Sequence, residues 1–326
     1  PGYVYTLVGL FKFSAQNDLV VRLPSVLAGV GLTYLAYYFA KELNLSLRYR
    51  LVMAGLVATA PVLIFFSRMA FEANLALFFL LGSLLLLLKK RDLLAVLLMS
   101  LAVLTYNTPL LLLPFIIVTI PFLRNYKKIK SWWLPVLVLS LVLVMSGWQL
   151  LSLSSQKSNI TIFQDETMWR QSVAYRQQFT GWQQTILGHR YAYYLRLMTN
   201  NYLQSFSPQF LVLGQGGHPW HSIPEAGHFY VLVYGLALIG LMVGLGEGVF
   251  GLTYNSRQER KLKVWLLYLT VISLLPAVVT VDAPHATRSL LFFFLLLVWA
   301  VIGFQKIEQL IFRERRHIWL WLVIIL

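Results

Sequence analysis

The sequence predicts an all-α integral membrane protein: a polytopic bundle of about nine to ten transmembrane helices, some of them short, with one loop subdomain. Three observations predict this class. The chain of 326 residues is 58% hydrophobic and only 12% charged, whereas about 25% of a soluble domain is charged. Its mean hydropathy is +0.69, and apolar runs recur along its length. Its lysines and arginines gather between those runs, so membrane topology explains the net charge of +15 better than nucleic-acid binding does.

The first half of the chain consists of apolar segments joined by short polar turns. A short apolar helix is expected at about 3–13, and full spans are expected at about 21–40, 51–66, 70–88 and 132–152. The stretches 92–105 and 108–123 fall short of the ~20 residues that a straight span needs. They are expected either as short tilted spans or as a hairpin that does not quite cross.

The character of the chain changes at residue 154. Residues 154–228 are rich in Gln, Ser, Tyr, Trp and His, so a loop subdomain is expected there, between a membrane region at 1–153 and another at 229–326. Within the loop, amphipathic patterns predict helices near 166–178 and 190–205. Spans resume at about 229–250, 264–281 and 289–304, with a last apolar run from 318. Because that run stops partway and Pro1 opens directly on an apolar stretch, we expect a chain that is cut at both ends.

The lysines and arginines are distributed unevenly between the two sides of the expected membrane topology. Most of the 27 lysines and arginines fall in five clusters, at 41–50, 89–91, 124–130, 257–263 and 306–316. An even number of apolar segments separates each cluster from the next, so all five are expected on one side, which the positive-inside rule makes cytoplasmic. We expect a multi-pass protein of the inner (plasma) membrane with its large loop outside. The outer cations are mostly arginines: Lys12, Arg22, Arg68, Lys157, Arg170, Arg176, Arg190, Arg196 and Arg288.

Soluble nucleotide and thiol chemistry have no support in the sequence. The chain has no cysteine, which excludes disulfides, thiolate metal sites and a cysteine nucleophile. It has no Walker loop, nucleophile elbow or dinucleotide fingerprint, and no cofactor is predicted. The spacing of His218 and His221 resembles that of metal ligands, but no third ligand is placed by sequence. Turn histidines near an aromatic interface are the favoured interpretation, and dependence on a divalent metal stays open.

Asp282, His285 and Arg288 form the densest polar cluster at a membrane edge. Their spacing fits one turn that leads into the helix expected from about Ser289. A phosphate there would gain the guanidinium of Arg288 and the amides at the start of the helix. Interfacial snorkelling is the structural alternative, but polar groups at membrane depth are costly and usually functional.

Other polar residues lie at the ends of the expected spans. Arg22 opens the first full span, as a membrane anchor or a second anion ligand. Arg68 and Glu72 are four residues apart and would meet on one helix face, either as a structural ion pair or as the rim of a pocket. Tyr106 and Asn107 are expected at a hairpin tip, where asparagine commonly forms turns.

Short motifs along nearly the whole chain share one pattern: Pro1-Gly2-Tyr3, Arg22-Leu-Pro-Ser-Val-Leu-Ala-Gly29, Ser67-Arg68-Met-Ala-Phe-Glu72-Ala-Asn74, Tyr106-Asn-Thr-Pro109, Asn159-Ile-Thr-Ile-Phe-Gln-Asp165, His221-Ser-Ile-Pro224 and Pro284-His285-Ala-Thr-Arg288. In this order the motifs resemble the C-type integral-membrane glycosyltransferases that use polyprenyl-phosphate sugars. That superfamily includes protein mannosyltransferases and lipid A aminoarabinose transferases, and the resemblance is to a bacterial subgroup.

The resemblance implies an enzyme that works at the outer face of the membrane. It would transfer a hexosyl or pentosyl group from a polyprenyl-phosphate carrier to a lipid, glycan or protein acceptor that the sequence does not identify. Position and chemistry make Arg288 and His285 the first candidates for binding the donor phosphate, with Arg22 and Arg68 behind them. The candidate substrate-pocket residues are Glu72, Tyr106, Asn107, Asp282 and His221. In the family the catalytic acidic residue precedes the Pro-Gly-Tyr motif, so it is expected upstream of residue 1, and Asp165 is not assigned to that role.

The main alternative is a transporter or flippase of lipid-linked glycans. Such a protein would place ionisable residues near the midplanes of its spans and would repeat broken helices. Here the expected span interiors are nearly free of charge, with Glu247, near an inner end, as the chief exception. A structural membrane scaffold and an oligosaccharide ligase or polymerase stay open as further interpretations.

Overall fold

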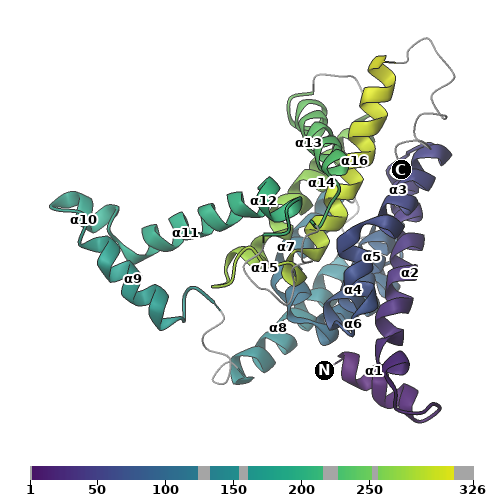
Figure 1. Ribbon diagram of the computed structural model, residues 1–326, viewed down its shortest axis with the longest axis horizontal. Helices are drawn as coiled ribbons and strands as arrows, with labels where there is room; N and C mark the ends of the chain where they lie inside the picture. Colours follow the sequence, from purple (N-terminus) through teal and green to yellow (C-terminus); the bar gives the residue numbers. More distant parts are fainter. Residues whose placement is uncertain (1, 124–132, 154–160, 216–226, 252–255, 312–326) are drawn as a thin grey trace.

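The computed structural model describes residues 2–123, 133–153, 161–215, 227–251 and 256–311. These residues confirm the all-α class. They form helices, and their only β-type pairing is an isolated antiparallel bridge between Thr161 and Thr280. Figure 1 shows a bundle of helices from which the helices of the loop region, labelled α9, α10 and α11, project to one side.

Eight helices are described in the ranges 2–123 and 133–153. They are α1 (Gly2–Phe11), α2 (Asp18–Glu42), α3 (Leu47–Thr59), α4 (Pro61–Arg68), α5 (Glu72–Leu88), α6 (Asp92–Thr105), α7 (Asn107–Leu123) and α8 (Trp133–Leu153). The expected span at 51–66 is broken into α3 and α4, which are bent by 53°. Pro61 causes the break, because it has no N–H to donate and forces the preceding Ala60 into an extended conformation.

The second half begins with the helices expected inside the loop region. They are α9 (Glu166–Arg176), α10 (Trp182–Ile186), α11 (Arg190–Ser205) and α12 (Pro208–Leu211). The bundle then resumes with α13 (Val231–Gly244), the π-helix η4 (Leu245–Val249), α14 (Arg257–Ser273), α15 (Leu275–Val278), the 3-10 turn η5 (Thr287–Ser289) and α16 (Leu290–Ile311). The amphipathic patterns at 166–178 and 190–205 therefore predicted α9 and α11 correctly.

Several helices are long and apolar enough to cross a membrane. Within the described ranges they are Asp18–Glu42, Val231–Val249, Arg257–Val278 and Thr287–Ile311, with α3 and α4 together as a fifth, bent span. Shorter apolar stretches of 10–17 residues are α1, α5, α6, α7 and the part of α8 at Pro135–Val144. The structure thus supports a multi-pass membrane protein, while the count of nine to ten spans is not confirmed.

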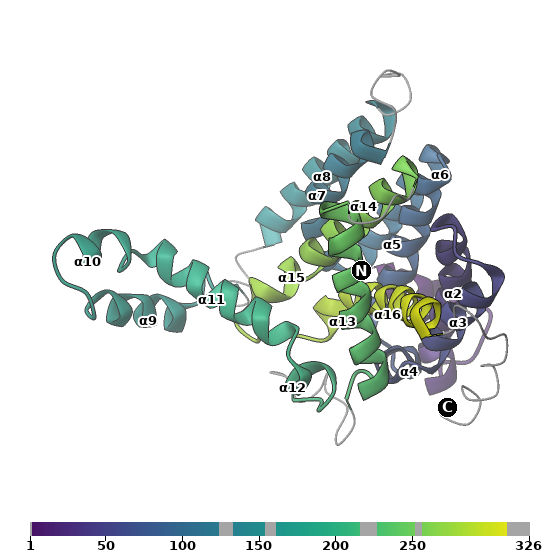
Figure 2. The same cartoon turned by 90° about the horizontal axis from the view of Figure 1, so that it is seen from above.

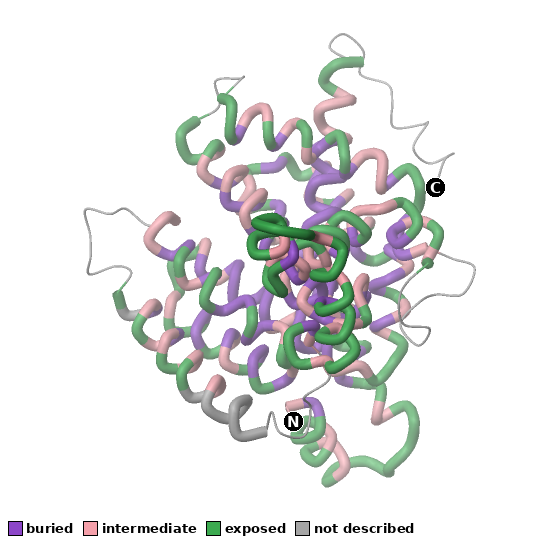
Figure 3. The backbone as a smooth tube through the Cα atoms, turned by 90° about the vertical axis from the view of Figure 1, so that its left-hand side faces the viewer, coloured by how far each residue is buried: buried purple, intermediate pink, exposed green. Residues whose placement is uncertain are grey.

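The centre of the bundle is α16. Every residue from Leu290 to Gly303 is buried, as expected for a helix that is apolar all round and surrounded by other helices. Helices α3, α5, α13 and α14 pack against it, and Figure 3 shows the buried residues gathered along the inner helices. The Nε1 group of Trp299 donates a hydrogen bond of 2.9 Å to Thr270 Oγ1, which joins α16 to α14.

Two glycines let α13 and α16 approach each other closely. A Cβ atom at Gly240 would collide with the carbonyl oxygen of Trp299 and would lie 3.0 Å from the nitrogen of Gly303. A Cβ at Gly303 would collide with the carbonyl oxygen of Leu236 and would lie 2.8 Å from the nitrogen of Gly240. Small residues commonly allow this kind of backbone contact between membrane helices, where dispersion replaces the hydrophobic effect as the main driving force.

The cation clusters meet at one end of the bundle. Lys263 and Lys306 both pair with Glu247, Arg48 pairs with Glu308, and the 4.0 Å pair between Lys89 and Glu42 joins the last turns of α5 and α2. Lys261 lies 5.3 Å from the ring of Phe122, near the end of α7. We call this the Glu247 end. The opposite end, where α5, α7 and α16 begin, is the Tyr106 end. The residues 124–130 and 313–316 lie outside the described ranges.

Replacing Gly240 by alanine should destabilise the bundle. The methyl group would force α13 away from α16, at a cost of about 1–3 kcal/mol, and should lower the midpoint of thermal unfolding in detergent. Gly235 is the matched control on α13, because a Cβ there meets nothing within 4 Å, and Gly235→Ala should leave the midpoint nearly unchanged. Equal midpoints for the two variants would contradict the close glycine contact.

Candidate functional site

A buried amide ties three helices together at the Tyr106 end. Asn74 Nδ2, on α5, donates to the carbonyl oxygen of Ser25 at 2.9 Å and also lies 3.4 Å from Ser67 Oγ. Ser25 Oγ in turn donates to the carbonyl oxygen of Phe66 at 2.8 Å. Ser25 and Asn74 are both fully buried. This network fixes α2, on which Arg22 lies one turn earlier, against the end of α4 and the start of α5.

A second chain of hydrogen bonds crosses from α6 to the start of α16. The hydroxyl of Tyr106 lies 3.3 Å from Thr287 Oγ1, which lies 2.9 Å from His285 Nδ1. Ser289 Oγ donates to the carbonyl oxygen of His285 at 2.9 Å. His285, Thr287 and Ser289 are buried, so these contacts hold the turn before α16 in one shape. The prediction that His285 and Arg288 lie on a turn leading into a helix from about Ser289 is confirmed.

Arg288 lies on that turn, and it is half-buried. Its Nη1 atom is shielded from solvent and has no hydrogen-bond partner among the described residues. Leaving a charged donor unsatisfied is costly, so such a group calls for an acceptor. Asp282, six residues earlier, is exposed, and no ion pair joins the two within the described part of the chain.

The two networks are neighbours, because α5 contacts both α7 and η5. Around them, Arg22 and Arg68 are exposed and Glu72 is half-buried. The expectation that Arg68 and Glu72 share a helix face is wrong. Helix α4 ends at Arg68, Met69 and Phe71 have extended backbones, and α5 begins only at Glu72. In the described residues neither side chain takes part in an ion pair.

The remaining predicted site residues do not lie together in one described site. Asn107 is the first residue of α7 and is exposed, whereas Tyr106 alone reaches the turn before α16. His218 and His221 lie outside the described residues. Across the described ranges, no group of three or more His, Cys, Asp or Glu residues is placed to hold a metal ion.

Sequence reasoning missed the small polar residues of this end. Thr287 bridges Tyr106 and His285, and Ser25 and Asn74 link helices, yet none of them was predicted to matter. The available signal was the presence of hydroxyl and amide groups within otherwise apolar helices, where each polar group needs a partner.

His228 is a further buried polar residue near this end. It is 0% exposed, and its ring lies against Phe210 and Phe293, with ring centroids 4.9 and 5.0 Å away. Within the described structure, neither ring nitrogen has a hydrogen-bond partner. Burial therefore lowers the pKa of His228 from 6.5 to about 4.

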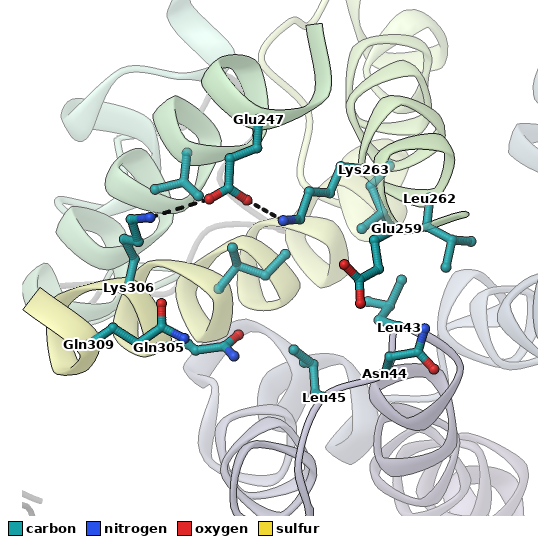
Figure 4. Close-up of a pocket in the computed structure, with 13 residues that line it drawn as sticks. Leu43, Asn44, Leu45, Glu247, Glu259, Leu262, Lys263, Gln305, Lys306 and Gln309 are labelled. Carbon is teal, nitrogen blue, oxygen red and sulfur yellow. Dashed lines mark hydrogen bonds and ion pairs between the residues drawn. The ribbon is translucent and has the colours of Figure 1, made fainter. Parts of the chain in front are cut away.

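A cavity of about 240 Å³ lies at the other end of the molecule, between the α2–α3 turn, η4, α14 and α16. Figure 4 shows Glu247 between Lys306 and Lys263, with Asn44, Gln305 and Glu259 on the far side of the cavity. The side chain of Glu247 is 13% exposed and lies 3.3 Å from Lys306 Nζ. Two lysines and two glutamates balance here, so the cavity has no excess of positive charge to attract a phosphate. It is distinct from the predicted arginine site.

Comparisons of the chain with protein-family models, with curated proteins and with solved structures find no match.

The buried His228 should make the fold sensitive to acid. Its folded-state pKa lies below the ordinary value, so the unfolded chain takes up the proton first as the pH falls. His228 should therefore cost no stability above about pH 6.5, and stability should be lost between pH 6.5 and about 4. The loss should reach roughly 3 kcal/mol. His228→Phe should flatten this part of a curve of unfolding midpoint against pH in detergent.

His189 provides the control for this prediction. It is exposed and caps the start of α11 by accepting a bond from the backbone N–H of Tyr191. His189→Asn removes an imidazole but keeps a capping group, and should preserve the acid sensitivity. An acid response unchanged by His228→Phe would show that another group causes it.

Proposed function

We propose that the chain is a glycosyltransferase that moves a sugar from a polyprenyl-phosphate carrier to an acceptor at the outer face of the membrane. The observation that carries this proposal is the half-buried Arg288, whose Nη1 donor is unsatisfied in the described structure. Arg288 lies beside the buried contacts of His285, Thr287 and Tyr106.

The chemistry of this end favours a phosphate ligand. A guanidinium group matches the geometry of phosphate oxygens, and its attraction strengthens where water is partly excluded. Arg288 lies just before a helix of 22 residues, whose positive end adds to the field. Arg22 and Arg68 supply further exposed cations at the same end of the bundle.

The proposed reaction breaks the bond between the sugar C1 atom and the phosphate oxygen. The acceptor oxygen, or nitrogen, forms the new bond to C1 and gives its proton to a base. The bonding electrons leave with the polyprenyl phosphate, which gains negative charge. Arg288 would stabilise that charge as it develops, which lowers the barrier. No residue of this chain is assigned as that base.

The contacts of His285 and Thr287 support a positioning role. Because Tyr106 directly follows α6 and Thr287 lies on η5, their contact holds the turn before α16 against the end of α6. Arg288 therefore starts from a fixed backbone position rather than from a free loop. Preorganisation of this kind is what an electrostatic site needs, since little energy is then spent on reorganisation when the charge develops.

The distribution of charge favours surface chemistry over transport. Among the described residues of the candidate spans, the charged side chains lie near the helix ends, as in the Glu247 cluster and at Arg288. The buried polar groups farther inside are neutral, such as Ser83 and Thr270. A flippase of lipid-linked glycans would instead need ionisable groups near the midplane.

The same proposal orients the protein. The lysines and arginines at the Glu247 end favour a cytoplasmic position for that end under the positive-inside rule. The Tyr106 end and α9–α12 would then face outward from the inner (plasma) membrane. The shorter apolar helices α5, α6, α7 and α8 would complete a bundle of about nine to ten spans by tilting, or by crossing where the bilayer is locally thin.

Arg288→Ala in the full-length protein should abolish most of the sugar transfer. In membranes supplied with radiolabelled polyprenyl-phosphate sugars, label should leave the lipid about 100-fold more slowly than with the unsubstituted protein. Arg288→Lys keeps the charge but loses the two-pronged geometry, so it should fall between the two. Arg257→Ala removes an exposed arginine at the Glu247 end and should leave the rate unchanged.

Two outcomes would overturn the proposal. Normal turnover and donor affinity in Arg288→Ala would remove the phosphate role of this residue. If the unsubstituted protein released no label but moved intact lipid-linked sugar between leaflets, the function would be that of a flippase.

A further inference from the structure

Helices α9, α10 and α11, which we call the arm, extend sideways from the bundle (Figures 1 and 2). The arm displays large apolar side chains instead of burying them. Trp182 is 69% exposed, Leu195 65% and Tyr191 59%. Exposed apolar side chains on neighbouring helices usually mark a surface that binds a partner or a membrane. Tryptophan and tyrosine in particular favour the boundary between lipid headgroups and acyl chains.

The inner half of α11 is fixed to the membrane-spanning helices. The hydroxyl of Tyr202 donates to the carbonyl oxygen of Val271 at 3.3 Å, and Asn201 Nδ2 donates to that of Val278 at 3.0 Å. Both acceptors belong to the candidate span Arg257–Val278. Val271 is itself 54% exposed on this apolar span, so lipid would cover it. Tyr202 therefore touches the bundle where its lipid-facing surface ends.

The geometry of α11 continues that surface outward. Tyr191, Leu195 and Tyr202 are separated by four and seven residues and lie along one flank of the helix. The flank that touches Val271 is thus the one that carries the exposed Leu195 and Tyr191 farther along the arm.

The other flank of α11 is polar and is covered by α9. Tyr193 donates from its hydroxyl to Gln171 Oε1 at 2.8 Å, and the guanidinium of Arg196 lies 5.3 Å from the ring centre of Tyr175. A hollow of about 460 Å³ between α9 and α11 is lined by this flank, including Asn200. Helix α9 thus packs against the flank of α11 that faces away from Val271.

We propose that the arm rests on the bilayer that the bundle spans, with the Tyr191–Leu195–Tyr202 flank of α11 inserted at the boundary between headgroups and acyl chains. Burying this flank in lipid would remove its apolar side chains from water. The arm also carries Arg170, Arg176, Arg190 and Arg196 against Asp165 and Glu166. This excess of arginine complements lipid phosphates. The inference depends on the spanning helices and not on the glycosyltransferase proposal.

The absence of cysteine allows a direct test by site-directed spin labelling. Single variants Leu195→Cys and Asn200→Cys place a nitroxide on the two flanks of α11, and Leu232→Cys places one on the exposed surface of α13 as a lipid reference. Each full-length variant is reconstituted in phospholipid vesicles that contain anionic lipid. Power saturation then compares collisions with oxygen, which concentrates in lipid, and with a water-soluble nickel chelate.

The labels at Leu195 and Leu232 should collide more with oxygen, and the label at Asn200 more with the nickel chelate. Leu195 is well exposed, so the substitution should not disturb folding, which gel filtration of the labelled protein checks. If the Leu195 label were as accessible to nickel as the Asn200 label while Leu232 remained in lipid, the arm would stand clear of the membrane and the proposal would fail. A water-exposed Leu232 label would overturn both the proposal and the spanning assignment of α13.

Discussion

The burial of α16 on all sides is the constraint on which the arrangement of this protein depends. Because Leu290–Gly303 is enclosed by other helices, the turn before it must emerge in the middle of the Tyr106 end rather than at the edge. The backbone contact between Gly240 and Gly303 brings α13 close enough to complete this enclosure. Arg288 is thereby placed next to α5 and α6, whose residues lie more than 180 positions earlier in the chain.

The charged side chains differ in their partners between the two ends of the bundle. At the Glu247 end, lysines and arginines meet carboxylates, as Lys263, Lys306 and Arg48 show. At the Tyr106 end, the described residues include no ion pair for Arg22, Arg68 or Arg288, and the buried contacts are made by hydroxyl and amide groups and by the ring of His285. Paired charges stabilise the Glu247 end. The described cations of the Tyr106 end have no carboxylate partner among the described residues, so this end is suited to bind an anionic ligand.

The arm extends this asymmetry beyond the bundle. It is attached to α14 through Tyr202 and to α15 through Asn201, and its arginines add cations on the same side as the proposed phosphate site. If the arm rests on lipid, its height above the membrane is fixed by the same surface that would hold the lipid carrier. An enzyme whose donor is anchored in the bilayer benefits from such a fixed height, since orientation of the reactants lowers the barrier.

The sequence by itself determined the all-α class, most helix positions and the gathering of cations at one end. These follow from local rules: apolar length, turn residues and charge in loops act over a few neighbouring residues. It also placed His285 and Arg288 on the turn before α16. Only the tertiary structure decided that Tyr106 meets Thr287 and that the break between α4 and α5 separates Arg68 from Glu72. It also decided that the ring nitrogens of His228 are buried without a hydrogen-bond partner among the described residues. Those features depend on contacts between distant helices, and no periodicity within one helix specifies which polar group on another helix will lie opposite it.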